Sequence, residues 1–297
     1  MTKATDNTDT PRGLGFVISA YLLWGFLPLY MKALSHVGPA EVVVHRVIWS
    51  VPVAGAVLFA MGRTRELREA LGNPRMLMQG AVTAALISVN WGIYIWAIAN
   101  GQAIEAALGY YINPLFSIFL GAVLLGERLN RIQMIAIGFA AMAVLLLTLE
   151  AGRLPLVAVG LMITWGFYAY FKKSLPIGPN QGFLLEVLIL SPFALAYMIY
   201  LAATGEAVFL TDTSTTLLLL AAGVVTSVPL LLYANGAKDV RMSTVGILQY
   251  IAPSMIFLIA VFVFDEPFGG MRVYAFPLIW LALVIYTLSM LRAWKRA

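Results

Sequence analysis

Ten apolar stretches, each close to the length that crosses a lipid bilayer, follow one another along this chain of 297 residues. A helix needs about 20 predominantly apolar residues to cross the hydrocarbon core. Several stretches contain Pro or Gly, which helices embedded in lipid tolerate. The pattern predicts an all-α membrane protein of ten helices. The predicted spans are residues 13–34, 40–61, 75–99, 104–125, 132–149, 155–171, 182–203, 215–237, 243–264 and 273–292.

The charged residues are too few to cover a water-soluble protein. Only 11% of the residues are Asp, Glu, Lys or Arg, whereas soluble domains carry about 25%. The net charge of +5 does not indicate nucleic-acid binding, because the basic residues lie between apolar stretches and form no basic stripe. The chain has no cysteine, which excludes disulfides and thiolate metal sites. We expect no cofactor and no metal.

The distribution of Lys and Arg orients the predicted spans. Loops on the cytoplasmic side carry an excess of these residues. With the N-terminus inside, fifteen of the 19 Lys and Arg residues are cytoplasmic and three are external, while Arg46 lies within a span. Both termini, including a polar tail of residues 1–12, are therefore predicted to be cytoplasmic. We expect a multi-pass protein of a bacterial inner membrane that acts as a monomer on a small-molecule substrate.

The two halves of the chain, residues 13–149 and 155–293, resemble each other. Trp-Gly-Phe at 24–26 recurs at 165–167, and at an offset of 139 residues Tyr94 recurs as Tyr233 and Pro114 as Pro253. Each half contains five spans, an odd number, so the second half must enter the membrane upside down. Inverted repeats are typical of secondary transporters, which expose one shared site alternately to the two faces. The alternative is that the duplication reflects ancestry alone.

Three segments carry a resemblance to a known family. They are EVVVHRVIWSVP at 41–52, GYYINP at 109–114, and GAVLLGERL, whose glutamate is Glu127. With these segments the chain resembles the EamA-type branch of the drug/metabolite transporter superfamily, and most of all its RarD-type members, over nearly its whole length. The resemblance implies a ten-helix fold around a central cavity and the efflux of metabolites, aromatic and other amino acids among them.

Polar and aromatic side chains inside the spans are the candidates for a substrate path. Asn90 and Tyr94 lie four residues apart on one face of the third span, and Tyr110 and Asn113 lie three apart in the fourth. Such groups are costly against lipid and should point inward, either to line a cavity or to join helices by hydrogen bonds. The predicted substrate-binding residues are Trp24, Asn90, Tyr94, Tyr110, Tyr111, Asn113, Trp165, Tyr168, Tyr233, Gln249 and Tyr250.

Prolines within the spans are candidate hinges. Pro28, Pro114 and Pro253 cannot donate a backbone hydrogen bond to the residue four positions earlier, so each is predicted to leave a carbonyl free. Kinked helices with free carbonyls recur where transporters hinge or bind substrate. Kinks without such a role are also common in membrane helices, and the repeat-related pair Pro114 and Pro253 is the stronger candidate.

Two charges within the spans occupy equivalent positions of the two halves. Arg46 and Glu186 are separated by 140 residues and lie about six residues into their spans. A charge at that depth is costly and is functional by default. Inversion places the two toward opposite faces, so we expect no direct ion pair. Arg46 either attracts a substrate carboxylate or snorkels outward and pairs with Glu41, and Glu186 is the candidate for proton coupling.

Other classes of function fit the sequence less well. With two His residues, no Cys and neither an HExxH nor a GxSxG motif, the usual constellations of an intramembrane enzyme are missing. A sensor or a channel explains the inverted duplication less well than a transporter does. An exporter of cationic drugs would use a deep acid such as Glu186. An exporter of amino acids fits the polar and aromatic residues best, and this preference draws largely on the resemblance.

Overall fold

The computed structural model describes residues 10–62, 64–125, 131–152, 154–174, 177–236, 239–240 and 248–294. These residues form eleven helices and no strand. Glu127 and the side chain of Pro114 lie outside this description. The helices are α1 (Pro11–Ala33), α2 (Pro39–Ala60), α3 (Arg65–Leu71), α4 (Pro74–Ala99), α5 (Ala103–Leu125), α6 (Arg131–Ala151), α7 (Leu156–Ser174), α8 (Pro179–Thr204), α9 (Thr213–Gly236), α11 (Ile251–Phe262) and α12 (Arg272–Trp294).

Proline and capping side chains determine where several helices begin. Helices α1, α2, α4 and α8 each start with a proline, whose fixed φ suits the first helical position and whose missing N–H would be unpaired there in any case. The hydroxyl of Thr10 accepts a hydrogen bond from the backbone N–H of Gly13, and the side chain of Asn73 accepts two at the start of α4. The polar segments between the predicted spans therefore contain the first residues of these helices.

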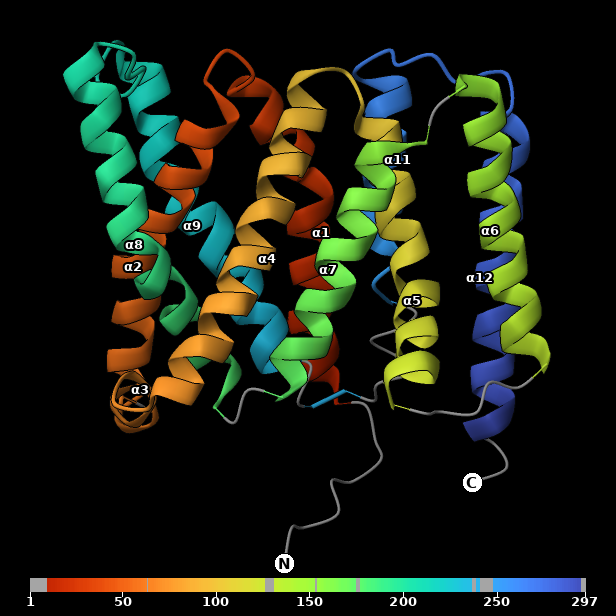
Figure 1. Ribbon diagram of the computed structural model, residues 1–297, viewed down its shortest axis with the longest axis horizontal. Helices are drawn as coiled ribbons and strands as arrows, with labels where there is room; N and C mark the ends of the chain where they lie inside the picture. The colour runs from red at the N-terminus through yellow and green to blue at the C-terminus, as the bar shows by residue number, and fades with distance from the viewer. Residues whose placement is uncertain are drawn as a thin grey trace, which may run out of the picture.

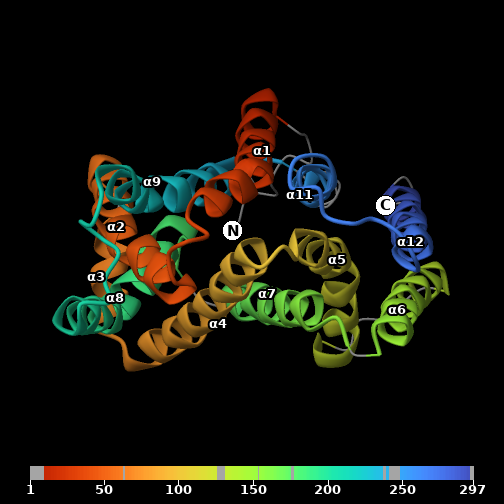
Figure 2. The ribbon, with the colours of Figure 1, turned by 90° about the horizontal axis from the view of Figure 1, so that it is seen from above.

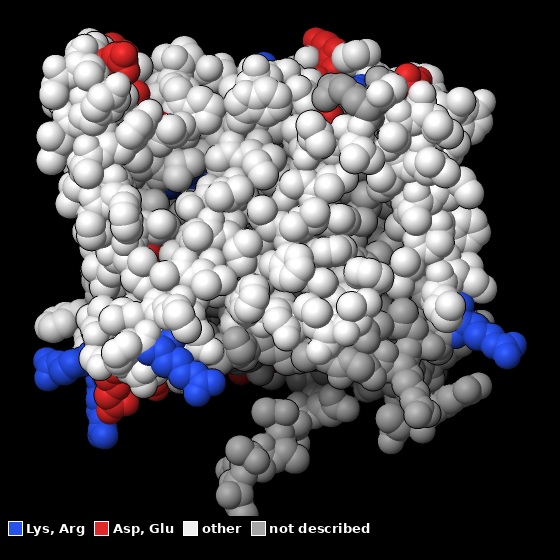
Figure 3. All heavy atoms as spheres, viewed as in Figure 1, with Lys and Arg blue, Asp and Glu red and all other residues white. Residues whose placement is uncertain are grey.

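Five of the described helices are long and apolar enough to cross a membrane. They are Pro11–Ala33, Pro39–Ala60, Pro74–Ala99, Asn180–Thr204 and Thr213–Tyr233. Large apolar side chains such as Phe59 and Phe193 are more than 70% exposed on the flank of the bundle. On the face drawn in Figure 3, charged residues gather toward the two ends and the flank between them is almost uncharged. The protein is therefore a multi-pass membrane protein.

All the helices except α3 run roughly side by side (Figure 1). The start of α1 and the end of α12 lie at the same end of the bundle, called here the lower end as it is drawn, and the opposite end is called the upper end. The short helix α3 lies at the lower end and packs against α4 and α8. The sequence did not predict α3, because it falls in the polar break between two spans.

Viewed along the helices, two rows face each other (Figure 2). Helices α1, α9 and α11 lie along one side, and α4, α5 and α7 lie along the other. Helices α2 and α8 pack together and close one end of these rows, whereas α6 and α12 stand as a pair at the other end. The other extensive helix contacts are α2 with α9, α1 with α9, α1 with α11, α4 with α7, α4 with α8, α5 with α7, and α5 with α11.

Two glycines allow unusually close helix packing. A Cβ on Gly223 of α9 would lie 2.2 Å from the backbone carbonyl carbon of Trp49 on α2. A Cβ on Gly109 of α5 would lie 2.8 Å from the carbonyl oxygen of Ala158 on α7. Real Cβ atoms do not approach backbone atoms this closely. Small residues bring membrane helices together in this way, because helix association in lipid depends on close van der Waals packing.

Candidate functional site

A row of aromatic side chains joins α4, α5, α7 and α8. Tyr94 packs against Tyr110 with the ring centroids 5.9 Å apart, and Tyr110 meets Trp165 edge-on at 6.4 Å. Trp165 contacts Tyr168 at 5.7 Å. The hydroxyl of Tyr168 donates a hydrogen bond of 3.3 Å to Oε2 of Glu186, which is buried. Five of the sequence-predicted residues thus form one continuous group.

A second aromatic cluster lies between α1 and α9. The rings of Trp24 and Tyr233 are 5.6 Å apart, and Tyr21 contacts both of them at 5.5 and 5.8 Å. Sequence reasoning missed Tyr21, although it lies three residues before Trp24 and therefore on the same face of the helix.

Arg46 is buried in the bundle, with 3% of its surface exposed. Its Nε donates a hydrogen bond of 2.9 Å to Oγ1 of Thr226 on α9. Its Cζ lies 4.3 Å from the centroid of the ring of Trp91 on α4, a cation–π arrangement. Neither partner could be predicted from the sequence, because both are distant along the chain and neither position has a special residue pattern.

The guanidinium of Arg46 has no acidic partner in the part of the chain that the structure describes. The one ion pair within 4.0 Å among those residues joins Arg65 and Glu69 at the surface. Arg46 instead contacts the hydroxyl of Thr226 and the ring of Trp91, which lies three residues before Tyr94 of the aromatic row on α4. The expected absence of a direct pair between Arg46 and Glu186 agrees with this arrangement.

The alternative partner of Arg46, Glu41, is engaged elsewhere. Oε1 of Glu41 accepts hydrogen bonds of 2.9 and 3.0 Å from the backbone N–H groups of Val208 and Phe209. The interpretation that Arg46 snorkels outward to pair with Glu41 is therefore wrong. No ion pair within 4.0 Å joins these two described residues, and the arginine is directed to Thr226 and Trp91.

Asn90 joins three helices by hydrogen bonds. Its amide nitrogen donates to the carbonyl oxygen of Leu161 at 3.2 Å and to the hydroxyl of Thr164 at 2.8 Å, both on α7. Its amide oxygen accepts a bond of 3.2 Å from the hydroxyl of Tyr110 on α5. Asn90 therefore makes the helix-joining hydrogen bonds that were the alternative to lining a cavity, and it fixes Tyr110 in the aromatic row.

The remaining predicted polar residues lie elsewhere on α5 and α11. The hydroxyl of Tyr111 donates to Oγ of Ser254 at 2.8 Å and so joins α5 to α11. Asn113 is buried within α5, and Gln249 and Tyr250 are half-buried directly before α11. Tyr111 therefore belongs to the packing between α5 and α11, on a different side of α5 from the row.

The three candidate hinge prolines differ in their positions. Pro28 lies inside α1 and is buried, and Pro114 lies inside α5. Pro253 is the third residue of α11, where the absence of its N–H breaks no helical hydrogen bond. Leu248 is also helical and residues 241–247 lie outside the described part of the chain, so the equivalence of Pro114 and Pro253 as hinges stays a prediction. The carbonyl of Gln249 precedes the helix.

Four glutamates at the upper end, of which Glu41, Glu105 and Glu266 are buried or partly buried and Glu150 is exposed, accept hydrogen bonds from backbone N–H groups of other segments. Glu266 accepts hydrogen bonds of 2.7 and 2.9 Å from the first two backbone N–H groups of α5. A carboxylate is favourable at a helix N-terminus, where unpaired N–H groups and the helix dipole both attract it. The other contacts are Glu41 with Val208 and Phe209, Glu105 with Val157 at 3.0 Å, and Glu150 with Met271 at 2.9 Å.

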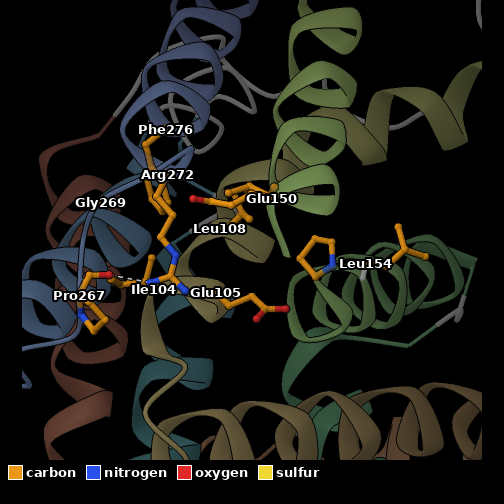
Figure 4. A pocket seen from close by; sticks show the side chains of 11 residues that line it. Ile104, Glu105, Leu108, Glu150, Leu154, Pro267, Gly269, Arg272 and Phe276 are labelled. Carbon is orange, nitrogen blue, oxygen red and sulfur yellow. Dashed lines mark hydrogen bonds between the residues drawn. The ribbon is translucent and has the colours of Figure 1, made fainter. Parts of the chain in front are cut away.

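A cavity of about 380 Å³ opens beside α5, α6 and α12 at the upper end (Figure 4). Arg272 extends into it and donates a hydrogen bond of 2.7 Å to the carbonyl oxygen of Pro267. Glu105 and Glu150 also line it, together with apolar side chains such as Leu108. The cavity shares no residue with the aromatic row or with the contacts of Arg46, and the sequence did not predict it.

Comparison with known proteins places this architecture in a family. Residues 11–149 match the EamA-like transporter family. Over 290 residues the chain is 41% identical to an uncharacterized transporter of Vibrio cholerae, covering 97% of this chain and 96% of the relative. It is 41% identical to the protein RarD of Streptomyces exfoliatus, covering 96% and 91%. The chain belongs to the EamA-like transporter family, in its RarD-type branch.

A solved crystal structure shares the fold of this RarD-type protein. The two align with a TM-score of 0.64 over 95% of this chain and 97% of the other, at 22% sequence identity. Identity this low supports the fold alone. The family resemblance expected from the three sequence segments is confirmed, and the Vibrio cholerae relative is named as a transporter.

Proposed function

We propose that this RarD-type protein is a secondary transporter of a bacterial inner membrane, which exports small metabolites by alternating access. Its proposed substrates are amino acids with aromatic or neutral side chains, and it acts as a monomer. Both termini are proposed to be cytoplasmic, so that the lower end faces the cytoplasm and the upper end the opposite side. The excess of Lys and Arg expected on the cytoplasmic side supports this orientation.

The observation that carries the proposal is the pattern of helix contacts. If two five-helix halves are related by inversion, α1 corresponds to α7, α2 to α8, α4 to α9, α5 to α11 and α6 to α12. Exchanging these labels turns the contact of α1 with α9 into that of α7 with α4, and the contact of α2 with α9 into that of α8 with α4. The contact of α1 with α11 likewise becomes that of α7 with α5.

Three more contacts map onto themselves under this exchange. They are α2 with α8, α5 with α11, and α6 with α12. A packing that is unchanged by exchanging its halves allows each half to adopt the conformation of the other, which is the basis of alternating access in transporters with inverted repeats. The two repeats proposed are residues 13–149 and 155–293, with ten membrane-crossing helices in all.

The side chains between the halves support a small amphipathic substrate. Tyr110 and Trp165 offer aromatic surface, while Arg46 and Glu186 offer one charge of each sign on different helices. A small solute needs such apolar walls with a few polar groups, and an amino acid carries a carboxylate, an ammonium group and a side chain to match them. The buried Glu186 also favours a second candidate, the export of cationic drugs, although a buried arginine disfavours it.

Counterflow uptake tests the proposal. Purified protein in liposomes loaded with an unlabelled amino acid should take up the labelled form saturably, with competition from related amino acids. Tyr94→Ala and Trp165→Ala should each reduce the uptake about tenfold or more if these rings contact substrate. Trp96→Ala is the control, because Trp96 is 43% exposed on the flank of α4. Uptake equal to that of empty liposomes would contradict the proposal.

A pH gradient across the same liposomes tests coupling. If Glu186 carries a proton during transport, the gradient should change the uptake rate of the wild-type protein and leave that of Glu186→Gln unchanged. An equal response of both proteins would exclude Glu186 as the coupling group. No response of the wild type would indicate facilitated diffusion.

A further inference from the structure

We infer that Arg46 binds the acid group of the transported molecule, so that the substrates of this protein are small carboxylic acids, with or without an amino group. The inference rests on the proposed transport function and adds the chemical group that the site must recognise. The structural basis is the surroundings of one side chain, which combine deep burial, the absence of an acidic partner among the described residues, and an unused hydrogen-bond donor at Nη1.

Arg46 carries a positive charge that is buried within a membrane-spanning segment. Arg46 lies seven residues after the start of α2, in a segment apolar enough to cross a membrane. A buried arginine is normally paired with an acid, because an uncompensated charge in a medium of low dielectric constant is strongly unfavourable. No described carboxylate lies within 4.0 Å of this one. An anion supplied by the ligand would provide the missing partner.

The guanidinium of Arg46 has one edge at which its hydrogen-bond donors are not used by the described residues. Thr226 occupies Nε, and the ring of Trp91 covers one face of the planar group. Nη1 is buried and has no hydrogen-bond partner among the described residues. The Nη edge of the fork is thus left for a ligand. A fixed, planar fork of donors suits a carboxylate, which can accept two parallel hydrogen bonds.

A second polar group without a described hydrogen-bond partner lies on α4. The hydroxyl of Tyr94 is also buried and also lacks a hydrogen-bond partner in the described part of the chain. Tyr94 lies three residues after Trp91, and therefore on the face of α4 that the guanidinium of Arg46 contacts. Unpartnered buried polar groups are rare in proteins and call for an explanation. A carboxylate bound by Nη1 and by the hydroxyl of Tyr94 would satisfy both groups at once.

The position of the site between the two halves fits a transported ligand. Arg46 and Trp91 come from α2 and α4, whereas Thr226 comes from α9 in the proposed second repeat. A movement of one half against the other would therefore change the access to the guanidinium. Figure 3 shows a hollow in the flank, between α8 and α4, with blue atoms at its floor.

The inference makes a prediction about probe molecules that differ in one group. L-phenylalanine and 3-phenylpropionate both carry a carboxylate, whereas L-phenylalanine methyl ester keeps the ammonium group and lacks the acid. The two acids should compete for uptake into liposomes, and the ester should compete at least about tenfold more weakly, since hydrogen bonds to a charged group are lost. In Arg46→Gln this difference between acid and ester should disappear.

A melting experiment without any ligand separates a binding role from a structural one. If Arg46 awaits a ligand anion, Arg46→Gln should melt at the same temperature as the wild type or at a higher one, because an uncompensated charge is removed. If Arg46 is structural, the variant should melt several degrees lower, and that result would overturn the inference. Arg75→Gln, which changes an exposed arginine, is the matched control.

The outcomes distinguish the inference from the proposed function. Transport in which the ester competes as well as the acids, unchanged in Arg46→Gln, would overturn the inference and leave the transporter in place. If the wild type transports none of the probes, the proposed amino-acid transport fails. The inference is then decided by melting, where 3-phenylpropionate should stabilise the wild type more than Arg46→Gln. Equal stabilisation of the two proteins would overturn it.

Discussion

Glu266 places both of its carboxylate oxygens on backbone N–H groups of another helix, at 2.7 and 2.9 Å, and it is almost fully buried. The residues that it holds, Ala103 and Ile104, open α5. Without the carboxylate, these two N–H groups would be buried without a partner, because a helix has no internal acceptor for its first donors. This side chain therefore determines how the upper end of α5 is attached.

We predict that Glu266→Gln lowers the free energy of unfolding by about 2 kcal/mol, because one acceptor oxygen is replaced by an amide that faces a donor. The measurement is the melting temperature of the purified protein in detergent. Glu69→Gln is the control, since Glu69 pairs with Arg65 on the exposed surface, where such a pair contributes little. An equal effect of the two substitutions would show that the buried contact does not stabilise the protein.

Single residues also mark the limit of what the sequence predicts. The sequence predicted that Arg46 and Glu186 lie deep within their spans, because a charged residue is conspicuous in an apolar stretch. The partners of Arg46 were not readable, because Trp91 and Thr226 are ordinary residues of other spans that only packing brings within reach. The role of Asn90 stayed open in the sequence for the same reason, since lining a cavity and joining helices require the same residue type.

The positions of the helices were easier to predict than which helices pack against each other. The predicted span 13–34 is α1 (Pro11–Ala33), and 75–99 is α4 (Pro74–Ala99), because proline and polar caps mark the helix starts. Of the span predicted at 243–264, residues 243–247 lie outside the described part of the chain, Leu248 is helical, and Ile251–Phe262 form α11. This shorter helix puts Pro253 in the first turn. Which helix packs on which could not be predicted, because in lipid the contacts depend on small residues and shape.

Helices α2 and α9 provide a test of this dependence on small residues. An alanine at Gly223 would place its Cβ 2.2 Å from the backbone of Trp49, and a backbone cannot rotate away as a side chain can. We predict that Gly223→Ala lowers the free energy of unfolding by about 1–3 kcal/mol through overpacking. Thermal unfolding in detergent measures this change. Gly223→Ala should also weaken the competition of carboxylic acids for uptake into liposomes, since the hydrogen bond between Arg46 and Thr226 joins the same two helices.

Gly55→Ala is the matched control on α2. A Cβ at Gly55 meets no atom within 4 Å, and alanine favours the helix by up to about 1 kcal/mol over glycine. The control should therefore melt at the same temperature as the wild type or slightly higher. A loss of stability in Gly55→Ala as large as that in Gly223→Ala would contradict the close-packing argument.

For the molecule as a whole, the proposed inversion gives meaning to the contacts at its upper end. Glu41, Glu105 and Glu150 lie before residue 152 and hold backbone groups after residue 155, while Glu266 does the reverse. All four contacts therefore join one proposed half to the other at the same end. Halves that move against each other must break such contacts when the upper end opens, which makes this end a gate in the proposed cycle.

The inversion itself can be tested with one pair of positions. Arg75 and Ser214 are separated by 139 residues, the offset that relates Tyr94 to Tyr233, and each is the exposed second residue of its helix. Helix α4, which contains Arg75, starts at the lower end, whereas α9, which contains Ser214, starts at the upper end (Figure 1). Repeat-related positions of an inverted pair must reach opposite faces of the membrane.

We predict that a membrane-impermeant maleimide labels Ser214→Cys in intact cells and labels Arg75→Cys only after the membrane is permeabilised. The natural chain has no cysteine, so each variant carries a single reactive thiol and the unmodified protein is the blank. Labelling of both variants from the same side would refute the inverted relation. Labelling of Arg75→Cys alone in intact cells would keep the inversion and reverse the orientation, which would place both termini outside and contradict the excess of basic residues expected in the cytoplasm.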